Sequence, residues 1–210
     1  MKPKILILDS DSDIFETYKE LLGNEDIELL LETDGDATLP RIKAELPKLV
    51  IMDCNLRNSS GLDVLQEVKK YDARLAVIMT TGNPSTQSAI EAMKFGAYDY
   101  LTKPFEINKM KQTIRKALEC STLHRKVHYT SDPGQLQEGD NDEDIMIGSS
   151  PEMLEIWKMV GKISDSDASV LIQGESGTGK ELLAKAIYYN SKRNNMPFLA
   201  VNCAAQPAEW

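Results

Sequence analysis

The sequence predicts an α/β protein with a five-stranded, doubly wound parallel sheet, followed by an incomplete P-loop α/β fragment. Three observations support this. Short Leu-rich and β-branched runs alternate five times with amphipathic segments up to about Glu119. Residues 130–144 then lose apolar periodicity and are rich in Asp, Glu, Gly and Gln, as expected of a solvated linker. A glycine-rich loop afterwards separates a strand candidate from a helix candidate.

The first part contains five strand and five helix candidates. The expected strands are Lys4–Leu8, Ile27–Leu31, Leu49–Asp53, Ala76–Thr80 and Tyr98–Leu101. The expected helices are Ile14–Leu22, Ala37–Leu46, Leu62–Tyr71, Thr86–Phe95 and a fifth from Glu106. Gly23 and Gly96 stand at helix ends, where glycine often adopts a left-handed backbone. Repeats of this length predict parallel strands with helices on both faces.

The second part is much shorter. Ser150 is a candidate N-cap and Pro151 a candidate first helical residue. A strand Ser169–Gln173, a helix through about Tyr189 and a strand Phe198–Val201 are expected next. So small a fragment buries too little surface for an ordinary stable domain, so we expect an incomplete second unit. The expected boundaries are 1–119, a helical extension and acidic linker at 120–144, and 145–210.

Composition favours a cytoplasmic globular protein. The 24 Lys and Arg residues against 33 Asp and Glu residues give a net charge of −9, and most of the acidic excess lies between Lys126 and Lys158. No basic stripe predicts direct DNA contact by this chain. Cys54, Cys120 and Cys203 are too few and too widely spaced for a disulfide framework or a zinc site. No apolar run is long enough to span a membrane, and no signal peptide precedes the first strand.

Polar residues follow four of the expected strands. Asp9 and Asp11 follow the first, Asp53 ends the third, Thr81 follows the fourth and Lys103 follows the fifth. Each residue alone has a plainer explanation as a turn former, a helix cap or a solvated charge. In a doubly wound sheet, however, the carboxyl ends of the strands converge on one crevice. A carboxylate nucleophile, a hard cation and donors for phosphate oxygens are what phosphoryl transfer to aspartate requires.

These residues lie in segments that resemble a response-regulator receiver domain, which has a flavodoxin-like fold. The resemblance covers residues 3–118 and rests on LILDSDSD, LVIMDCNLRNSSGLDVL, IMTTGNP and GAYDYLTKPF. It implies that Asp53 is the phosphoacceptor and that Mg²⁺ is held by Asp53, the Asp9 carboxylate and the backbone carbonyl of Asn55. It further implies that Thr81 binds a phosphate oxygen and that Lys103 pairs with the phosphoryl group.

The same resemblance implies a cis Lys103–Pro104 bond and assigns Tyr100 as an aromatic switch residue that turns inward when Thr81 moves. An ordinary aromatic residue on an edge strand is the alternative for Tyr100.

The sequence departs from the family pattern at Ser10, where a second acid is usual, and at Arg57, where proline is usual. A hydroxyl is a weaker, neutral ligand for Mg²⁺ than a carboxylate, and Asp11 is the next candidate to compensate, through water. We therefore predict weaker Mg²⁺ affinity with retained phosphorylation.

The glycine-rich loop matches the phosphate-binding pattern G-x-x-x-x-G-K between a predicted strand and helix. Its backbone N–H groups and the helix N-terminus would face phosphate oxygens, and its lysine would reach the outer phosphates. A glycine-rich turn without a ligand is the alternative. The candidate ATP-binding residues are Gly174, Glu175, Ser176, Gly177, Thr178, Gly179 and Lys180.

Glu181 occupies the position where the general motif has Ser or Thr for Mg²⁺. GESGTGKE and the surrounding segments, from about Ile147 to Ala205, resemble the sigma-54-dependent activators of the AAA+ class. That resemblance implies that Ile147 and Gly148 contact adenine. The alternative is a structural role for these two residues, in strand-end packing and in a turn. The acidic hydrolysis motif, sigma-contacting loop, arginine finger and helix-turn-helix are absent, so we do not expect productive ATP hydrolysis.

The helix from Glu106 carries Ile107, Met110, Ile114 and Ala117 at a spacing that suits either a dimer seam or packing on the sheet. His124 and His128 are one turn apart, and solvated linker histidines are favoured over a metal pair.

The combined interpretation is a two-component response regulator of the NtrC type. Its expected partners are a sensor histidine kinase, sigma-54 RNA polymerase in the intact family protein, and a second copy of the chain. The alternatives are a receiver-like module that dimerises without phosphorylation and a small stand-alone nucleotide kinase.

Overall fold

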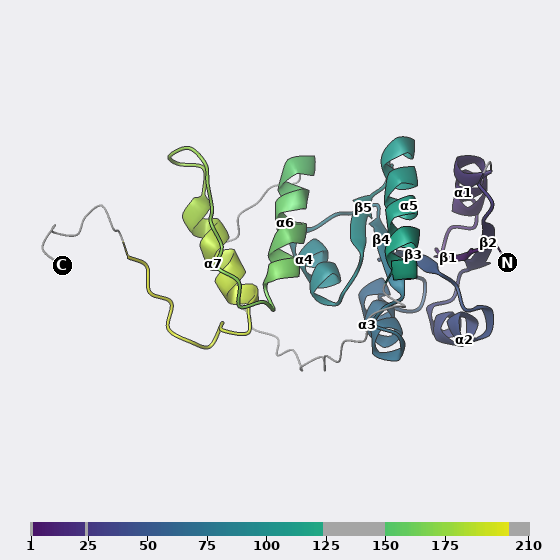
Figure 1. Ribbon diagram of the computed structural model, residues 1–210, viewed down its shortest axis with the longest axis horizontal. Helices are drawn as coiled ribbons and strands as arrows, with labels where there is room; N and C mark the ends of the chain where they lie inside the picture. Colours follow the sequence, from purple (N-terminus) through teal and green to yellow (C-terminus); the bar gives the residue numbers. More distant parts are fainter. Residues whose placement is uncertain (1, 24, 124–149, 202–210) are drawn as a thin grey trace, which may run out of the picture.

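The computed structural model describes residues 2–23, 25–123 and 150–201, and its first part is a parallel sheet with helices on both faces (Figure 1). The strands are β1 Lys4–Leu8, β2 Glu28–Glu32, β3 Leu49–Asp53, β4 Ala76–Thr81 and β5 Asp99–Thr102. The helices are α1 Ile14–Leu22, α2 Gly35–Glu45, α3 Gly61–Tyr71, α4 Thr86–Lys94, α5 Ile107–Leu123, α6 Pro151–Ile163 and α7 Lys180–Asn190. The strand order is β2-β1-β3-β4-β5, which confirms the predicted five-stranded doubly wound sheet.

Alternation along the strands creates two cores. On β1, Ile5 and Ile7 face the core under α1 and α5, whereas Leu6 and Leu8 face the core on the α3 and α4 side. All four side chains are at most 1% exposed. Helices cover both faces, so the central strands are continuous apolar runs rather than alternating polar and apolar ones.

The register of the sheet brings the strand ends to one edge. Leu8 of β1 pairs with Met52 of β3, and Asp53 pairs with Thr80 of β4. The residues after β1 and at the end of β3 therefore emerge side by side, because β1 and β3 are neighbours at the point where the strand order reverses.

Side-chain caps fix several helix starts. Ser60 accepts a hydrogen bond from the backbone N–H of Leu62 at the start of α3. Ser85 and Ser88 form a reciprocal capping box at the start of α4. Ser150 accepts from the backbone N–H of Met153, with Pro151 in the first turn of α6, as predicted.

The two glycines predicted to be left-handed behave differently. Gly96 has a φ of 87°, which confirms the prediction. Gly23 has a φ of −56° and remains right-handed, so that prediction is wrong. There the backbone N–H of Glu25 bonds to the carbonyl of Leu22, and this tight turn ends the helix without a left-handed residue. Leu46, which follows α2, takes the left-handed conformation instead, with a φ of 51°.

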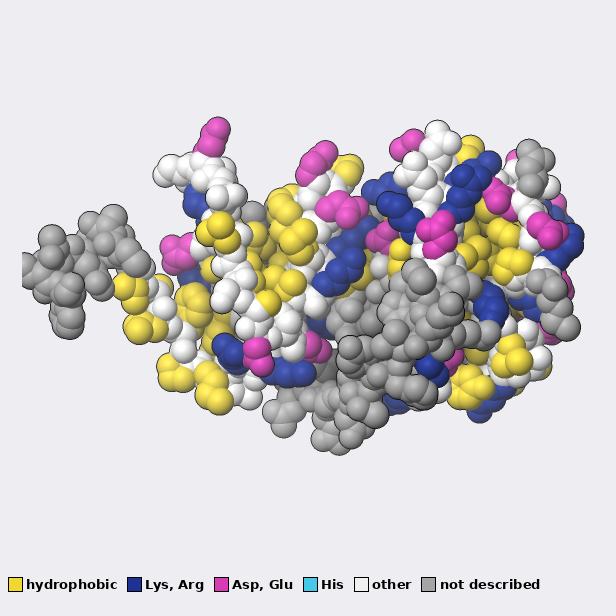
Figure 2. All heavy atoms as spheres, viewed as in Figure 1, with side chains coloured by type: hydrophobic (Ala, Val, Ile, Leu, Met, Phe, Trp, Pro, Cys, Tyr) yellow, Lys and Arg dark blue, Asp and Glu magenta, His cyan; other side chains and the backbone are white. Residues whose placement is uncertain are grey.

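Two predicted strands are wrong. No strand forms at Ser169–Gln173 or at Phe198–Val201. A strand needs a neighbour to satisfy its backbone groups, and no described segment pairs with either stretch. Most of their side chains are exposed, with Leu171 82% and Leu199 83% exposed. Figure 2 shows hydrophobic side chains gathered over α7 and the segment after it.

The apolar stripe of α5 packs on the sheet. Met110, Ile114 and Ala117 are fully buried in the core beneath α1 and α5, which favours sheet packing over a dimer seam along this stripe. Ile107 is exposed. His124 and His128 lie outside the described residues. Within the part of the chain that the structure describes, no helix is long and apolar enough to cross a membrane.

Candidate functional site

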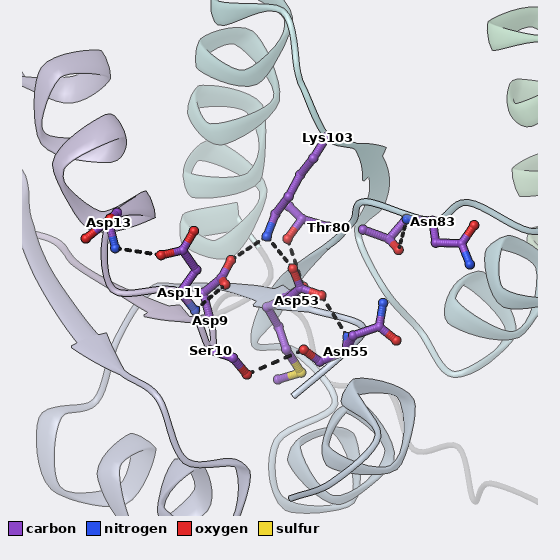
Figure 3. Close-up of polar contacts among 11 residues, drawn as sticks. Asp9, Ser10, Asp11, Asp13, Asp53, Asn55, Thr80, Asn83 and Lys103 are labelled. Carbon is purple, nitrogen blue, oxygen red and sulfur yellow. Dashed lines mark hydrogen bonds and ion pairs between the residues drawn. The ribbon is translucent and has the colours of Figure 1, made fainter. Parts of the chain in front are cut away.

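A lysine joins two buried carboxylates at the carboxyl edge of the sheet (Figure 3). Lys103, from the loop after β5, places its Nζ 2.6 Å from Oδ2 of Asp9 and also contacts Oδ2 of Asp53. Asp9 and Asp53 are 4% and 7% exposed, and such charges are tolerated in a protein interior when they are paired. The structure thus brings together three of the residues predicted from separate strands.

Backbone donors fix the other oxygen of each carboxylate. The N–H of Asn55 donates to Oδ1 of Asp53 at 2.7 Å, and the N–H of Asp11 donates to Oδ1 of Asp9 at 3.0 Å. Each aspartate therefore accepts a bond from the residue two positions later, the local pattern that favours Asp in turns. Both carboxylates are oriented by their own loops.

The site favours a charged lysine and a neutral thiol. Burial alone would lower the pKa of Lys103, but hydrogen bonds and negative charge from Asp53 and Asp9 outweigh it and raise that pKa above its ordinary value. Burial, reinforced by the negative charge of Asp53, raises the pKa of the neighbouring Cys54 to about 12, although Lys103 opposes the rise. Cys54 is therefore an unreactive thiol at neutral pH.

Thr81 is buried but is not joined to Asp53 by a described contact. Its Oγ1 accepts a hydrogen bond from the backbone N–H of Asn83 at 3.1 Å. Thr80 is the residue that pairs in register with Asp53, and its hydroxyl donates to the carbonyl of Met52 at 3.4 Å. Thr80 is not among the residues that the sequence predicts for the site, and only the strand register identifies it as a neighbour of Asp53.

Tyr100 is fully buried on β5 and points inward. Its hydroxyl lies 2.8 Å from Oγ of Ser88, which belongs to the capping box of α4. Burial raises the pKa of Tyr100, and the hydrogen bond with Ser88 offsets part of that rise. The aromatic residue therefore connects β5 to the start of α4. The Lys103–Pro104 bond is cis, as the resemblance implied.

The oxygen atoms near Asp53 fit a hard divalent cation. Carboxylates of Asp9 and Asp53 and a backbone carbonyl at Asn55 are ligand types that Mg²⁺ prefers. Ser10 donates from Oγ to the carbonyl of Asn55 at 3.5 Å, so it borders the same place. Among the described residues there is no group of three or more His, Cys, Asp or Glu suited to a metal.

Asp11 is turned away from this group. Its carboxylate accepts from the backbone N–H of Asp13 at 3.0 Å and points toward the start of α1 (Figure 3). Arg57 donates to the carbonyl of Ser10 at 3.3 Å and so packs against the same loop.

The glycine-rich loop is exposed and is held closed by its own side chains. Nζ of Lys180 donates to the carbonyls of Gly174 and Glu175 at 3.0 and 2.5 Å, and Oγ1 of Thr178 donates to the carbonyl of Glu175 at 2.8 Å. Gly177 and Gly179 have φ values of 81° and 80°, which only glycine adopts without strain.

The remaining residues predicted for nucleotide binding are less constrained. Glu181, in the first turn of α7, forms an ion pair with Lys185 at 3.8 Å. Ser176 is exposed. Ile147 and Gly148 lie outside the described residues.

The doubly wound sheet, with two aspartates and a lysine at its carboxyl edge, defines a receiver-class signalling domain. Residues 5–115 match the response regulator receiver domain family, and residues 146–210 match the sigma-54 interaction domain family. The chain therefore belongs to the NtrC-type response regulators, which combine these two domains.

Curated relatives share this arrangement. Regulatory protein AtoC of Escherichia coli strain K12 is 33% identical over 204 residues, which cover 97% of this chain and 44% of AtoC. Luminescence regulatory protein LuxO of Vibrio campbellii is 32% identical over 97% of this chain and 43% of LuxO. The chain thus spans less than half the length of these relatives.

Solved structures agree. NtrX from Brucella abortus in complex with ATP has a TM-score of 0.56 and 32% identity, covering 99% of this chain and 45% of that one. A receiver domain from Clostridium thermocellum has a TM-score of 0.55 and 33% identity, covering 58% of this chain and 98% of that one.

Proposed function

We propose that this chain accepts a phosphoryl group on Asp53 from a sensor histidine kinase and thereby controls the sigma-54 activator segment that follows. The observation that carries the proposal is the convergence of Asp9, Asp53 and Lys103 at one sheet edge, with both carboxylates buried and one cation between them. Such a cation offsets the charge of an incoming phosphoryl group.

In the proposed reaction, Oδ of Asp53 attacks phosphorus, an O–P bond forms, and the N–P bond of the donor phosphohistidine breaks. The leaving imidazole keeps the electron pair and takes up a proton from solvent. The backbone N–H of Asn55 holds one oxygen of Asp53 so that the other faces the donor. Lys103 moves from its ion pairs with the carboxylates to the transferred phosphoryl oxygens.

Asp9, Asp53 and the Asn55 carbonyl would hold Mg²⁺. When bound, this ion neutralises phosphoryl oxygens and supports in-line transfer. Ser10 supplies no charge and Asp11 faces α1, so we expect weak Mg²⁺ affinity. In this proposal Thr81 and Tyr100 report the phosphorylated state to α4 through the Ser88 hydroxyl, with Thr81 binding a phosphate oxygen.

For the second segment we propose binding of ATP with Mg²⁺ at Gly174–Lys180, with further contacts from Glu181, Ile147 and Gly148. The left-handed glycines of this loop support the proposal, because they turn backbone N–H groups toward a phosphate. The proposed partners, taken from the family, are sigma-54 RNA polymerase and a second copy of the chain, and the proposed location is the cytoplasm.

Acetyl phosphate labelling followed by intact-mass measurement tests the main proposal. With saturating Mg²⁺ the wild-type chain should gain one phosphoryl group that neutral hydroxylamine removes, as expected of an acyl phosphate. Asp53→Asn should abolish the gain, whereas Asp63→Asn, an exposed change on α3, should leave it unchanged. Label that persists in Asp53→Asn contradicts the assignment.

Ser10 favours one alternative, a receiver-like module that works without phosphorylation, because the metal site has one acid fewer than is usual in the family. An unlabelled wild-type chain at saturating Mg²⁺ would support this alternative.

A further inference from the structure

Helix α6 of the sigma-54 activator segment lies against α4 of the receiver (Figure 1). Trp157 and Val160 of α6 are each 2% exposed. They belong to the same core cluster as Ile90 and Met93 of α4. The contact is therefore a continuation of the receiver core rather than a loose touch between two surfaces.

A glycine allows the two helices to approach closely. A Cβ atom added at Gly161 would lie 2.5 Å from the carbonyl oxygen of Ile90 and 2.8 Å from the Cβ of Met93. The first neighbour is backbone and cannot move aside as a flexible side chain would. Any residue larger than glycine must therefore push α6 away from α4.

A buried charge fixes the register of the contact. Lys158 is 3% exposed, and its Nζ lies 2.7 Å from Oδ1 of Asp99 on β5. Glu155, one turn earlier on α6, is a second partner at 3.1 Å and also pairs with Lys109 of α5 at 3.2 Å. A buried ammonium that loses its partner is costly, so the docked position of α6 depends on Asp99.

The pKa of Glu155 agrees with this network. Partial burial alone would raise that pKa, but hydrogen bonds from Lys158 and Lys109 lower it below its ordinary value. The carboxylate therefore stays charged at neutral pH and supports both lysines.

The docked helix also connects the two candidate sites. Asp99 and Lys103 flank Tyr100 on β5 and the following loop, and Tyr100 bonds to Ser88 in the capping box of α4. On the far side, Leu183, Ala186 and Ile187 of α7 pack against the same core cluster as Trp157. Packed side chains are thus continuous from the phosphoacceptor edge to the helix after the P-loop.

We propose that α6 is a built-in ligand of the α4–β5 face, recognised through the close approach at Gly161 and the Lys158–Asp99 ion pair. We further propose that this contact, rather than the covalent connection through residues 124–149, couples the receiver to the P-loop segment. The second proposal, coupling, rests on the proposed function of Asp53. The first proposal, recognition of α6 by the α4–β5 face, does not.

The fluorescence of Trp157 tests recognition in the full chain. Trp157 and Trp210 are the two tryptophans, so Trp210→Phe leaves Trp157 as the sole reporter. Acrylamide should quench Trp157 weakly in this background. Gly161→Ala should raise the quenching constant several-fold, although alanine is the better helix former. Met159→Ala, on the exposed side of α6, is the matched control and should leave quenching low. Low quenching in Gly161→Ala would overturn the recognition proposal.

A double-mutant cycle isolates the ion pair. Asp99→Asn should increase quenching, because Lys158 keeps its charge but loses its buried partner. Lys158→Met removes the charge at similar volume and should leave α6 docked. The double variant, Asp99→Asn with Lys158→Met, should show the low quenching of Lys158→Met. If the two effects were additive, the double variant would instead show the increased quenching of Asp99→Asn. Additive effects, or low quenching in Asp99→Asn, would contradict the assigned register.

Beryllofluoride with Mg²⁺, a phosphoryl analogue, tests the coupling. It should change the quenching constant of Trp157 by about twofold or more, because a ligand shifts a two-state contact only through differential binding. Asp53→Asn should abolish the response. A Gly-Ser insertion after Gly134 should preserve it, because docking stays intramolecular. The coupling proposal would be overturned if the Gly-Ser insertion abolished the beryllofluoride-induced change in Trp157 quenching. It would also be overturned if Gly161→Ala retained that change.

The two proposals fail in different ways. If acetyl phosphate does not label the chain, the function proposed for Asp53 fails and the coupling proposal fails with it, while the quenching results still decide recognition. If labelling succeeds but Trp157 does not respond to beryllofluoride, only the coupling proposal is overturned.

Discussion

The receiver and the segment after residue 150 have similar sequence signals but different degrees of tertiary structure. In the receiver, every predicted strand has a neighbour, and Ile51 on the central strand β3 is 1% exposed. In the second segment the two predicted strands remain unpaired, and Leu199 is 83% exposed. Both regions nevertheless form the expected helices, α6 and α7 included.

This difference shows which signals are local. A helix satisfies its own backbone and needs a cap and an apolar face, which Ser150 and Trp157 provide for α6. A strand depends on partners distant in sequence. An apolar run such as residues 169–173 therefore predicts a strand only where other strands are present to receive it.

The largest expected difference between the two regions comes from truncating one apolar residue in each. Ile51→Ala should lower the free energy of unfolding by about 2–5 kcal/mol, because it leaves a cavity between two buried faces. Leu199→Ala should change it by less than about 0.5 kcal/mol, because the side chain is already in solvent. Urea denaturation followed by far-UV circular dichroism measures both. Equal losses would show that residues 197–201 are packed in solution.

The pH dependence of stability also distinguishes the two regions, because the receiver encloses Cys54 and Lys103, two groups that resist deprotonation. The pKa of Cys54 rises from 9.0 in the unfolded chain to about 12 in the fold, so the neutral thiol favours the folded state. Its contribution is complete below pH 9 and is lost as the pH rises from there toward 12. Lys103 acts in the same direction, since its raised pKa means that its ion pairs are lost at still higher pH.

We therefore expect the free energy of unfolding to fall above pH 9, with a slope from Cys54 of at most about 1.4 kcal/mol per pH unit. Cys54→Ala should make the decline between about pH 9 and about pH 10 shallower. Urea denaturation across this range measures the slope for both chains. Equal slopes would mean that the thiol is as solvated in the folded state as in the unfolded one.

The smallest test compares two helix caps. Ser60→Ala at α3 and Ser150→Ala at α6 each remove one hydrogen bond to a backbone N–H and should cost about 1 kcal/mol. Hydrogen exchange should show faster exchange in the first turn of the affected helix alone. If Ser150→Ala also exposes Trp157, docking of α6 requires the cap as well as the close approach at Gly161.

Much of the receiver could be predicted from the sequence. Periodicity and turn residues located all five strands, and Leu49–Asp53 was predicted to the residue. Asp9, Asp53 and Lys103 could be predicted to converge because parallel strands end at one edge. The exact side-chain relations could not be predicted. Thr80, rather than Thr81, pairs in register with Asp53, and a shift of one residue along a strand reverses the face to which a side chain points.

By itself, the amino-acid sequence determined the alternation of strands and helices, the caps, and the set of chemical groups at the strand ends. Those features depend on neighbours within a few positions, where sequence and structure are tightly coupled. Only the tertiary structure decided that Lys103 lies between two carboxylates, that residues 169–173 find no partner strand, and that Gly161 and Lys158 seat α6 on α4. Each of these outcomes depends on contacts between residues far apart in the chain, whose geometry no local pattern specifies.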